Sequence, residues 1–149
     1  MERIQKLVRD KIPEIMRAKG QTPVSVTSLR EDPDKAMVFL ERKLLEETYE
    51  VFDVLHDYNR GFQGTETGDS LRDILIGELI GELGDLKEVI RTIEKMQGIT
   101  DSEVEAARRR KLEERGGFDD MMVQEFNYAG DDPPTPRPFL KYFVTSFDT

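Results

Sequence analysis

The sequence predicts an all-α fold, a helical bundle of about four main helices with a proline-rich C-terminal arm that could include a short strand. Apolar residues recur at steps of three and four between recognisable helix start and stop signals. A chain of 149 residues has the length of one compact domain, and its Leu, Ile, Val and Phe suffice for a core. Cysteine is absent, so the core has no disulfide framework to assist it.

The first predicted helix covers about residues 10–19. Asp10 is the expected N-cap, Pro13 falls in the tolerated first turn, and Gly20 marks the end. After it, residues 22–28 (TPVSVTS) alternate weakly and are a candidate for a short extended piece.

The second predicted helix covers about residues 34–59, following Asp32-Pro33 and ending before Gly61. Residues 61–70 (GFQGTETGDS) have the composition of a loop. The third helix covers about residues 71–97 and the fourth begins with Asp101 or Ser102 as cap and ends at Gly116-Gly117. Residues 119–149 contain four prolines and the apolar run FLKYFVTSF.

Composition and charge exclude several classes of function. The net charge of −9 argues against binding to a nucleic-acid polymer or an anionic membrane, which need clustered Lys and Arg. No run of about 18 apolar residues and no signal peptide are present, so a cytoplasmic protein is expected. Without Glu-x-x-His around the single histidine, a di-iron carboxylate bundle is also disfavoured, and His56 is predicted to be an ordinary surface or boundary residue.

Acidic residues occupy positions on the second helix where apolar residues are expected. Its inward stripe consists of Met37, Leu40, Leu44, Val51, Leu55 and Tyr58. Glu47 lies inside this stripe, three residues after Leu44 and four before Val51. At about 100° per residue, Glu46 and Glu50 lie within about 100° of Glu47. The three carboxylates therefore share one sector of the helix.

The third helix repeats this anomaly. Its stripe consists of Leu75, Leu79, Leu86, Val89, Ile93 and Met96. Glu82 takes the position four before Leu86, and Asp85 lies one turn further on. Antiparallel packing of the two helices would bring both acidic clusters together. Crowded, semi-buried carboxylates need a cation, and a hard divalent ion such as Mg²⁺ fits carboxylate ligands best. The alternative is that the acids pair with Lys43, Arg72 or Lys87, or lie on a solvated face.

Three glycines interrupt the third helix at Gly77, Gly81 and Gly84, on one face beside the acids. Each costs roughly 0.8–1 kcal/mol relative to alanine. Close helix approach or space for a ligand could offset this cost.

These motifs resemble the all-α NTP pyrophosphatase superfamily typified by MazG, which includes the phosphoribosyl-ATP pyrophosphohydrolases. The superfamily pattern of EExxE and ExxD is similar to Glu46, Glu47 and Glu50 followed by Glu82 and Asp85. A narrower likeness is to a subgroup that begins KLVRDKIP, here residues 6–13, and closes with RGGF, here residues 115–118.

The resemblance implies a helical catalytic domain over residues 1–118 and a C-terminal extension over residues 119–149. It implies that Glu47, Glu50, Glu82 and Asp85 bind Mg²⁺, for which Mn²⁺ could substitute, with Glu46 supporting the site or orienting the attacking water. The substrate would be a nucleoside triphosphate, cleaved to a monophosphate and pyrophosphate, and the enzyme would be a homodimer or homotetramer.

A triphosphate needs cationic side chains in addition to the metal. Lys111 and Arg115, one turn apart on the fourth helix, and Arg9 and Lys11, in the N-terminal motif, are the candidates. For Lys111 and Arg115 the alternative is a solvated helix face. For the whole chain the alternative is a non-catalytic helical oligomerisation or regulatory module that binds nucleotide or protein without turnover.

Overall fold

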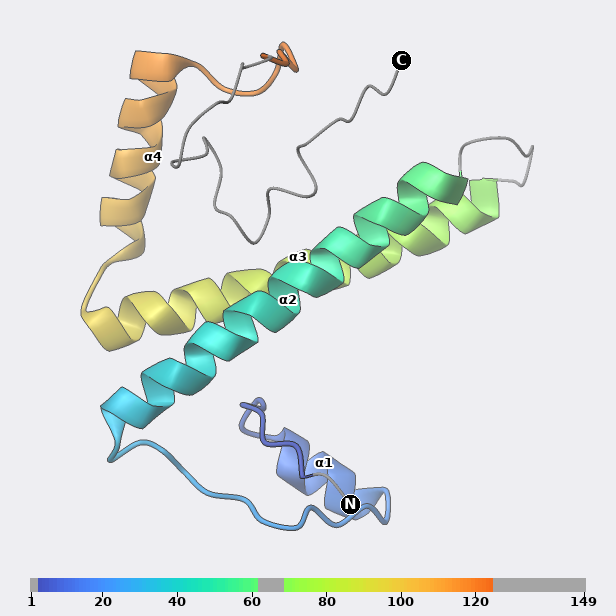
Figure 1. Cartoon of the computed structure of the whole chain (residues 1–149), viewed down its shortest axis with the longest axis vertical. Coiled ribbons are helices and arrows are strands. Elements are labelled where there is room, and N and C mark those ends of the chain that lie inside the picture. Colours follow the sequence, from blue (N-terminus) through green and yellow to red (C-terminus); the bar gives the residue numbers. More distant parts are fainter. Residues whose placement is uncertain (1–2, 62–68, 125–149) are drawn as a thin grey trace, which may run out of the picture. The chain divides into compact units, whose positions relative to one another are not determined.

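The part of the protein that the structure describes is all-helical, as the sequence predicts. Its computed structural model describes residues 3–61 and 69–124, within which four helices follow one another in the chain (Figure 1). They are α1 (Ile12–Ala18), α2 (Pro33–Gly61), α3 (Asp69–Gln97) and α4 (Asp101–Arg115). The chain divides into two compact units, Met1–Arg109 and Arg110–Thr149, so α4 begins in the first unit and ends in the second.

The two long helices α2 and α3 form an antiparallel hairpin and make most of the contacts between elements in the described part of the chain (Figure 1). At one end of the hairpin, Gln97 at the end of α3 donates a hydrogen bond to Met37 in the first turns of α2. Leu40, Leu75 and Val89 are buried between them. Among the described helices, none has the length and apolar character needed to cross a membrane.

Side-chain caps fix where α2 and α4 begin. Asp32 Oδ1 accepts a hydrogen bond from the Lys35 amide at 3.1 Å, and Pro33 takes the first helical position. In α4 the prediction of Asp101 or Ser102 as cap is wrong. Thr100 caps the helix: its Oγ1 accepts from the Glu103 amide at 3.3 Å, and Glu103 Oε2 accepts from the Thr100 amide at 2.8 Å. This reciprocal pair is a capping box.

The shorter α1 begins later than predicted. The Arg9 carbonyl accepts from the Ile12 amide at 2.9 Å, and this backbone turn leads into the helix at Ile12. Lys11 is the N-cap residue and makes no side-chain cap hydrogen bond, so Asp10 is not the cap. The predicted end is confirmed: Gly20, with φ of 76°, takes the left-handed conformation that closes a helix.

Three further expectations differ from the structure. Residues 22–28 form no strand. Leu55 and Met96, predicted to face inward, are 43 % and 37 % exposed. Gly61, Asp69 and Ser70, which were predicted to lie in the loop between the long helices, belong to α2 and α3. Residues 62–68 of the predicted loop and residues 125–149 of the predicted arm lie outside the described residues.

The glycines of α3 are not explained by close packing within the described chain. A Cβ added at Gly77, Gly81 or Gly84 would meet nothing within 4 Å. Close approach of α2 therefore does not explain these glycines, and the face of α3 beside its acidic residues is open.

Candidate metal centre

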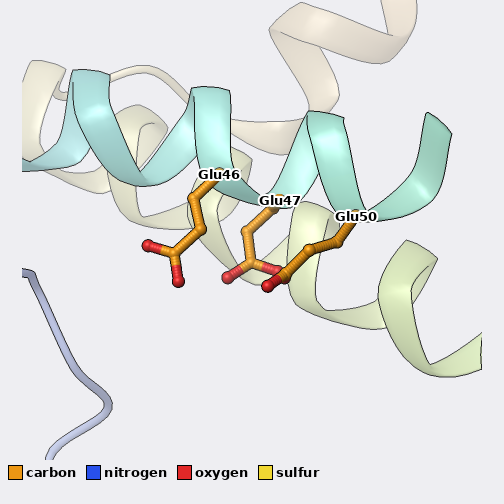
Figure 2. Close-up of side chains that lie close together, drawn as sticks. All are labelled: Glu46, Glu47 and Glu50. Atoms are coloured by element: carbon orange, nitrogen blue, oxygen red, sulfur yellow. The ribbon is translucent and has the colours of Figure 1, made fainter. Parts of the chain in front are cut away.

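Three acidic residues from α2 and α3 meet at the middle of the hairpin. Glu47, Glu82 and Asp85 each place one carboxylate oxygen within 4.8 Å of the other two. A second group, Glu46, Glu47 and Glu50, meets the same criterion on α2 alone, so Glu47 belongs to both groups. Figure 2 shows the three α2 side chains projecting from one side of the helix, with the carboxylates of Glu47 and Glu50 next to each other. The five acids predicted from the sequence are thus brought together.

Glu47 is the centre of this cluster and the only buried charged residue in the described part of the chain, at 3 % exposure. Its Oε1 pairs with Lys43 Nζ at 2.5 Å. Its Oε2 is buried and has no hydrogen-bond partner among the residues that the structure describes. A buried carboxylate oxygen without a donor costs free energy, and a cation at this point would remove the cost.

Lys43 supplies positive charge from within α2 itself. Its Nζ lies 3.0 Å from Glu46 Oε1 and pairs with Glu47 one turn further on. Burial alone would lower the pKa of Lys43, but the hydrogen bonds to Glu47 and Glu46 outweigh it and raise the pKa. The alternative of intrahelical pairing therefore holds for Lys43, whereas Arg72 and Lys87 form no ion pair among the described residues.

Glu46 and Glu50 differ in their electrostatic surroundings. Burial would raise the pKa of Glu46, but hydrogen bonds from Lys43 and Lys6 outweigh it and lower the pKa. For Glu50 the pKa is raised first by burial, then by a side-chain hydrogen bond with Glu47, and then by the charges of Glu47, Glu82 and Glu46. No lysine of the described chain pairs with Glu50 to offset this repulsion, so negative charge is in excess on that side of the cluster.

Two cations from the N-terminal segment also contact the cluster. Lys6 Nζ donates to Glu46 Oε1 at 3.1 Å, and Arg9 Nη2 donates to Asp85 Oδ1. These contacts join residues 40 and 76 positions apart in the sequence. Of the predicted basic residues, Arg9 is therefore at the site. Lys6 was not predicted, because no periodic pattern shows where an irregular segment folds back.

The other predicted basic residues are exposed. Lys11 makes no ion pair within the part of the chain that the structure describes. Lys111 and Arg115 belong to the second compact unit, so their role in binding phosphate stays a prediction. His56 is exposed and stacks on Phe52, with ring centroids 6.0 Å apart, which fits a surface residue.

The donor set suits a hard divalent cation, because every candidate ligand is a carboxylate and one buried oxygen lacks a donor. Comparison with the sequence profiles of protein families, with curated proteins and with solved structures finds no match. The fold and the site together define an all-helical protein with an acidic cluster that could hold a metal ion.

Proposed function

We propose that this chain is a magnesium-dependent nucleoside triphosphate pyrophosphohydrolase that converts a nucleoside triphosphate and water to a monophosphate and pyrophosphate in the cytoplasm. The observation that carries the proposal is the buried Glu47 carboxylate, whose Oε2 lacks a donor within a cluster contributed by two helices. A protein selected for stability alone would place an apolar residue at this position.

The cation would be held by Glu47, Glu82 and Asp85, with Glu50 as a further ligand beside Glu47. All four present hard oxygen donors, which favours Mg²⁺ and allows Mn²⁺. When bound, such an ion neutralises phosphate charge and lowers the pKa of a coordinated water.

The remaining residues have roles that follow from their contacts. Glu46 is anchored by Lys6 and Lys43 and is placed beside Glu47, where it can accept a hydrogen bond from an attacking water and orient it. Lys43 limits the negative charge of the cluster when no cation is bound. The open glycine face of α3 leaves room beside the acids for a substrate.

The type of reaction is supported by the motif resemblance, from EExxE and ExxD to the KLVRDKIP and RGGF segments. Release of pyrophosphate from a panel of standard, deoxy and modified nucleoside triphosphates, with Mg²⁺ and with EDTA, tests it directly. Nucleotide binding without turnover across the panel would instead favour the non-catalytic module.

The point of attack can be tested separately. Water should attack the α-phosphorus, so oxygen-18 from labelled water should enter the monophosphate product. Label in pyrophosphate, or a diphosphate as the main product, would contradict the proposed cleavage even if the cation site were correct. Mass spectrometry of both products after one turnover distinguishes these outcomes.

A homo-oligomer is part of the proposal. The outer face of α2, opposite its contact with α3, carries the exposed residues Val38, Leu45, Tyr49 and Phe52. At about 100° per residue, their spacing places the four side chains within about 40° of one common direction around the axis of α2. A helix with apolar stripes on opposite sides is typical of the interior of a bundle. A second copy of the hairpin would cover this stripe. Sedimentation equilibrium of the protein and of the Leu45→Glu variant measures the oligomeric state.

A further inference from the structure

The N-terminal segment before α1 is held against the acidic cluster by two cations. Lys6 contacts Glu46 on α2, and Arg9 contacts Asp85 on α3. The segment therefore bridges the two helices that supply the candidate ligands. Both cationic side chains are more than half exposed, at 58 % for Lys6 and 56 % for Arg9. Ion pairs this exposed contribute little to stability and are readily exchanged.

The two contacts differ in what they occupy. Lys6 pairs with Glu46, which lies outside the group of acids shared between the helices. Arg9 pairs with Asp85, which belongs to that group together with Glu47 and Glu82. A divalent cation among these three carboxylates would take Asp85 as a ligand and would repel the guanidinium beside it. Arg9 and the cation therefore compete for the same carboxylate.

Lys43 cannot exchange in the same way. It is on α2, one turn from Glu47, and its side chain is only 19 % exposed. Its backbone position is fixed by the helix, so it stays near the cluster whether or not a cation is bound. Arg9 lies outside any helix, on a segment that precedes Ile12. Among the cations that contact the cluster, Arg9 is the one that both blocks a shared ligand and is free to turn away.

We propose that Arg9 is a counter-ion of Asp85 that a divalent cation displaces, and that the displaced guanidinium then binds the phosphate groups of the substrate. This inference rests on the proposed function, because it requires a cation at Glu47, Glu82 and Asp85. It adds an order of binding: the cation binds first and creates the anion site. The cation does not take Glu46, the partner of Lys6, so Arg9 is the cation of this segment that has to leave its carboxylate. A guanidinium suits this role because it pairs with both carboxylate and phosphate oxygens.

The exchange predicts that loss of Arg9 changes the affinities for two ligands in opposite directions. In Arg9→Gln, a competitor for Asp85 is lost, so Mn²⁺ measured alone by electron paramagnetic resonance should bind about two- to fivefold more tightly. Magnesium pyrophosphate measured by calorimetry should bind about tenfold or more weakly, because a charge-assisted contact is lost. Pyrophosphate in EDTA should bind the variant and the unchanged protein equally, since Arg9 is then engaged with Asp85. Arg17→Gln, which removes one exposed charge from α1, is the matched control and should change neither affinity.

The outcomes separate the inference from the proposed function. Weaker binding of both Mn²⁺ and magnesium pyrophosphate in Arg9→Gln would mean that Arg9 only holds the fold together. Unchanged binding of both would mean that the Arg9–Asp85 ion pair has no part in binding either ligand. Either result overturns the exchange while leaving the cation site intact. Absence of Mn²⁺ binding to the unchanged protein would overturn the cation site and the exchange together. Arg9→Lys should restore part of the pyrophosphate affinity, which a purely steric role of Arg9 would not predict.

Discussion

Replacing Glu47 with glutamine should stabilise the metal-free protein and remove most of its response to magnesium. Glu47 is 3 % exposed, and its Oε2 has no donor within the described part of the chain. An unsatisfied buried group of this kind costs about 1–3 kcal/mol. Glutamine keeps the shape, removes the charge and offers an amide to the neighbouring Glu50 or Glu82. Lys43 loses one partner but keeps Glu46, at 3.0 Å.

The expected net gain without metal is about 1 kcal/mol, or about 2–4 °C in melting temperature for a chain of this size. With Mg²⁺ at a hundred times its dissociation constant, the unchanged protein should gain about 2.7 kcal/mol, because a ligand that binds only the folded state stabilises it by mass action. The order of the two stabilities should therefore reverse when Mg²⁺ replaces EDTA.

Urea denaturation followed by circular dichroism, in EDTA and in millimolar Mg²⁺ at matched ionic strength, measures both effects. Glu41→Gln removes one charge from an exposed position of the same helix and is the control. A variant less stable than the unchanged protein in EDTA would refute the reasoning about the buried oxygen. A full magnesium response in the variant would exclude Glu47 as a ligand.

Three other predictions concern activity and pH. Glu50→Gln and Asp85→Asn should each lower kcat about a hundredfold or more with unchanged helicity, and near-native turnover in the folded variants would exclude both residues from the site. Lys111→Ala and Arg115→Ala should raise KM for the triphosphate more than they lower kcat. Unaltered steady-state constants would mean that both residues only form a solvated helix face. Hydrogen bonds from Thr100 lower the pKa of Glu103 below its ordinary value of 4.5, so the stability that Glu103 confers is present above pH 4.5 and is lost as the pH falls through the lowered value. Urea titrations of Glu103→Ala between pH 7 and 3 should show a deficit that shrinks with acidification, and a deficit independent of pH would contradict this.

The helices and the acidic cluster could be predicted because both depend on local periodicity. Glu47 interrupts an apolar stripe, and its burial against α3 follows from the geometry of an amphipathic helix. The hairpin then brings Glu82 and Asp85 to it, since consecutive long helices commonly pack antiparallel. Neither step requires knowledge of a distant segment.

The start of α4 shows where local patterns become ambiguous. Thr100 and Ser102 are both followed three residues later by a glutamate, so the sequence contains two overlapping capping boxes. Glu103 completes the first with Thr100. Glu105 instead forms ion pairs with Arg108 and Arg109, which hold its pKa at about 2. Whether Thr100 or Ser102 caps α4 depends on competition between a capping hydrogen bond and side-chain ion pairs. The periodicity of the sequence contains no information about this competition.

Contacts of the N-terminal segment could not be predicted for a different reason. An irregular segment has no repeating face, so its sequence does not indicate which side chains it will meet. Lys6 and Arg9 reach Glu46 and Asp85 because the irregular N-terminal segment folds back onto residues 40 and 76 positions further along the chain.

The sequence separations of these contacts imply an order of folding. Glu47 and Asp85 come together when one hairpin closes, and they are 85 − 47 = 38 residues apart in the sequence. Arg9 and Asp85 are 76 residues apart, which is twice that sequence separation. Each doubling of loop length adds about 0.6 kcal/mol of closure entropy, and contacts between nearby elements form faster than distant ones. The carboxylates should therefore assemble before the N-terminal segment docks. On the proposed function, a nascent or refolding chain would bind a divalent cation as soon as the hairpin exists, and the amino-terminal residues would then meet a neutralised cluster.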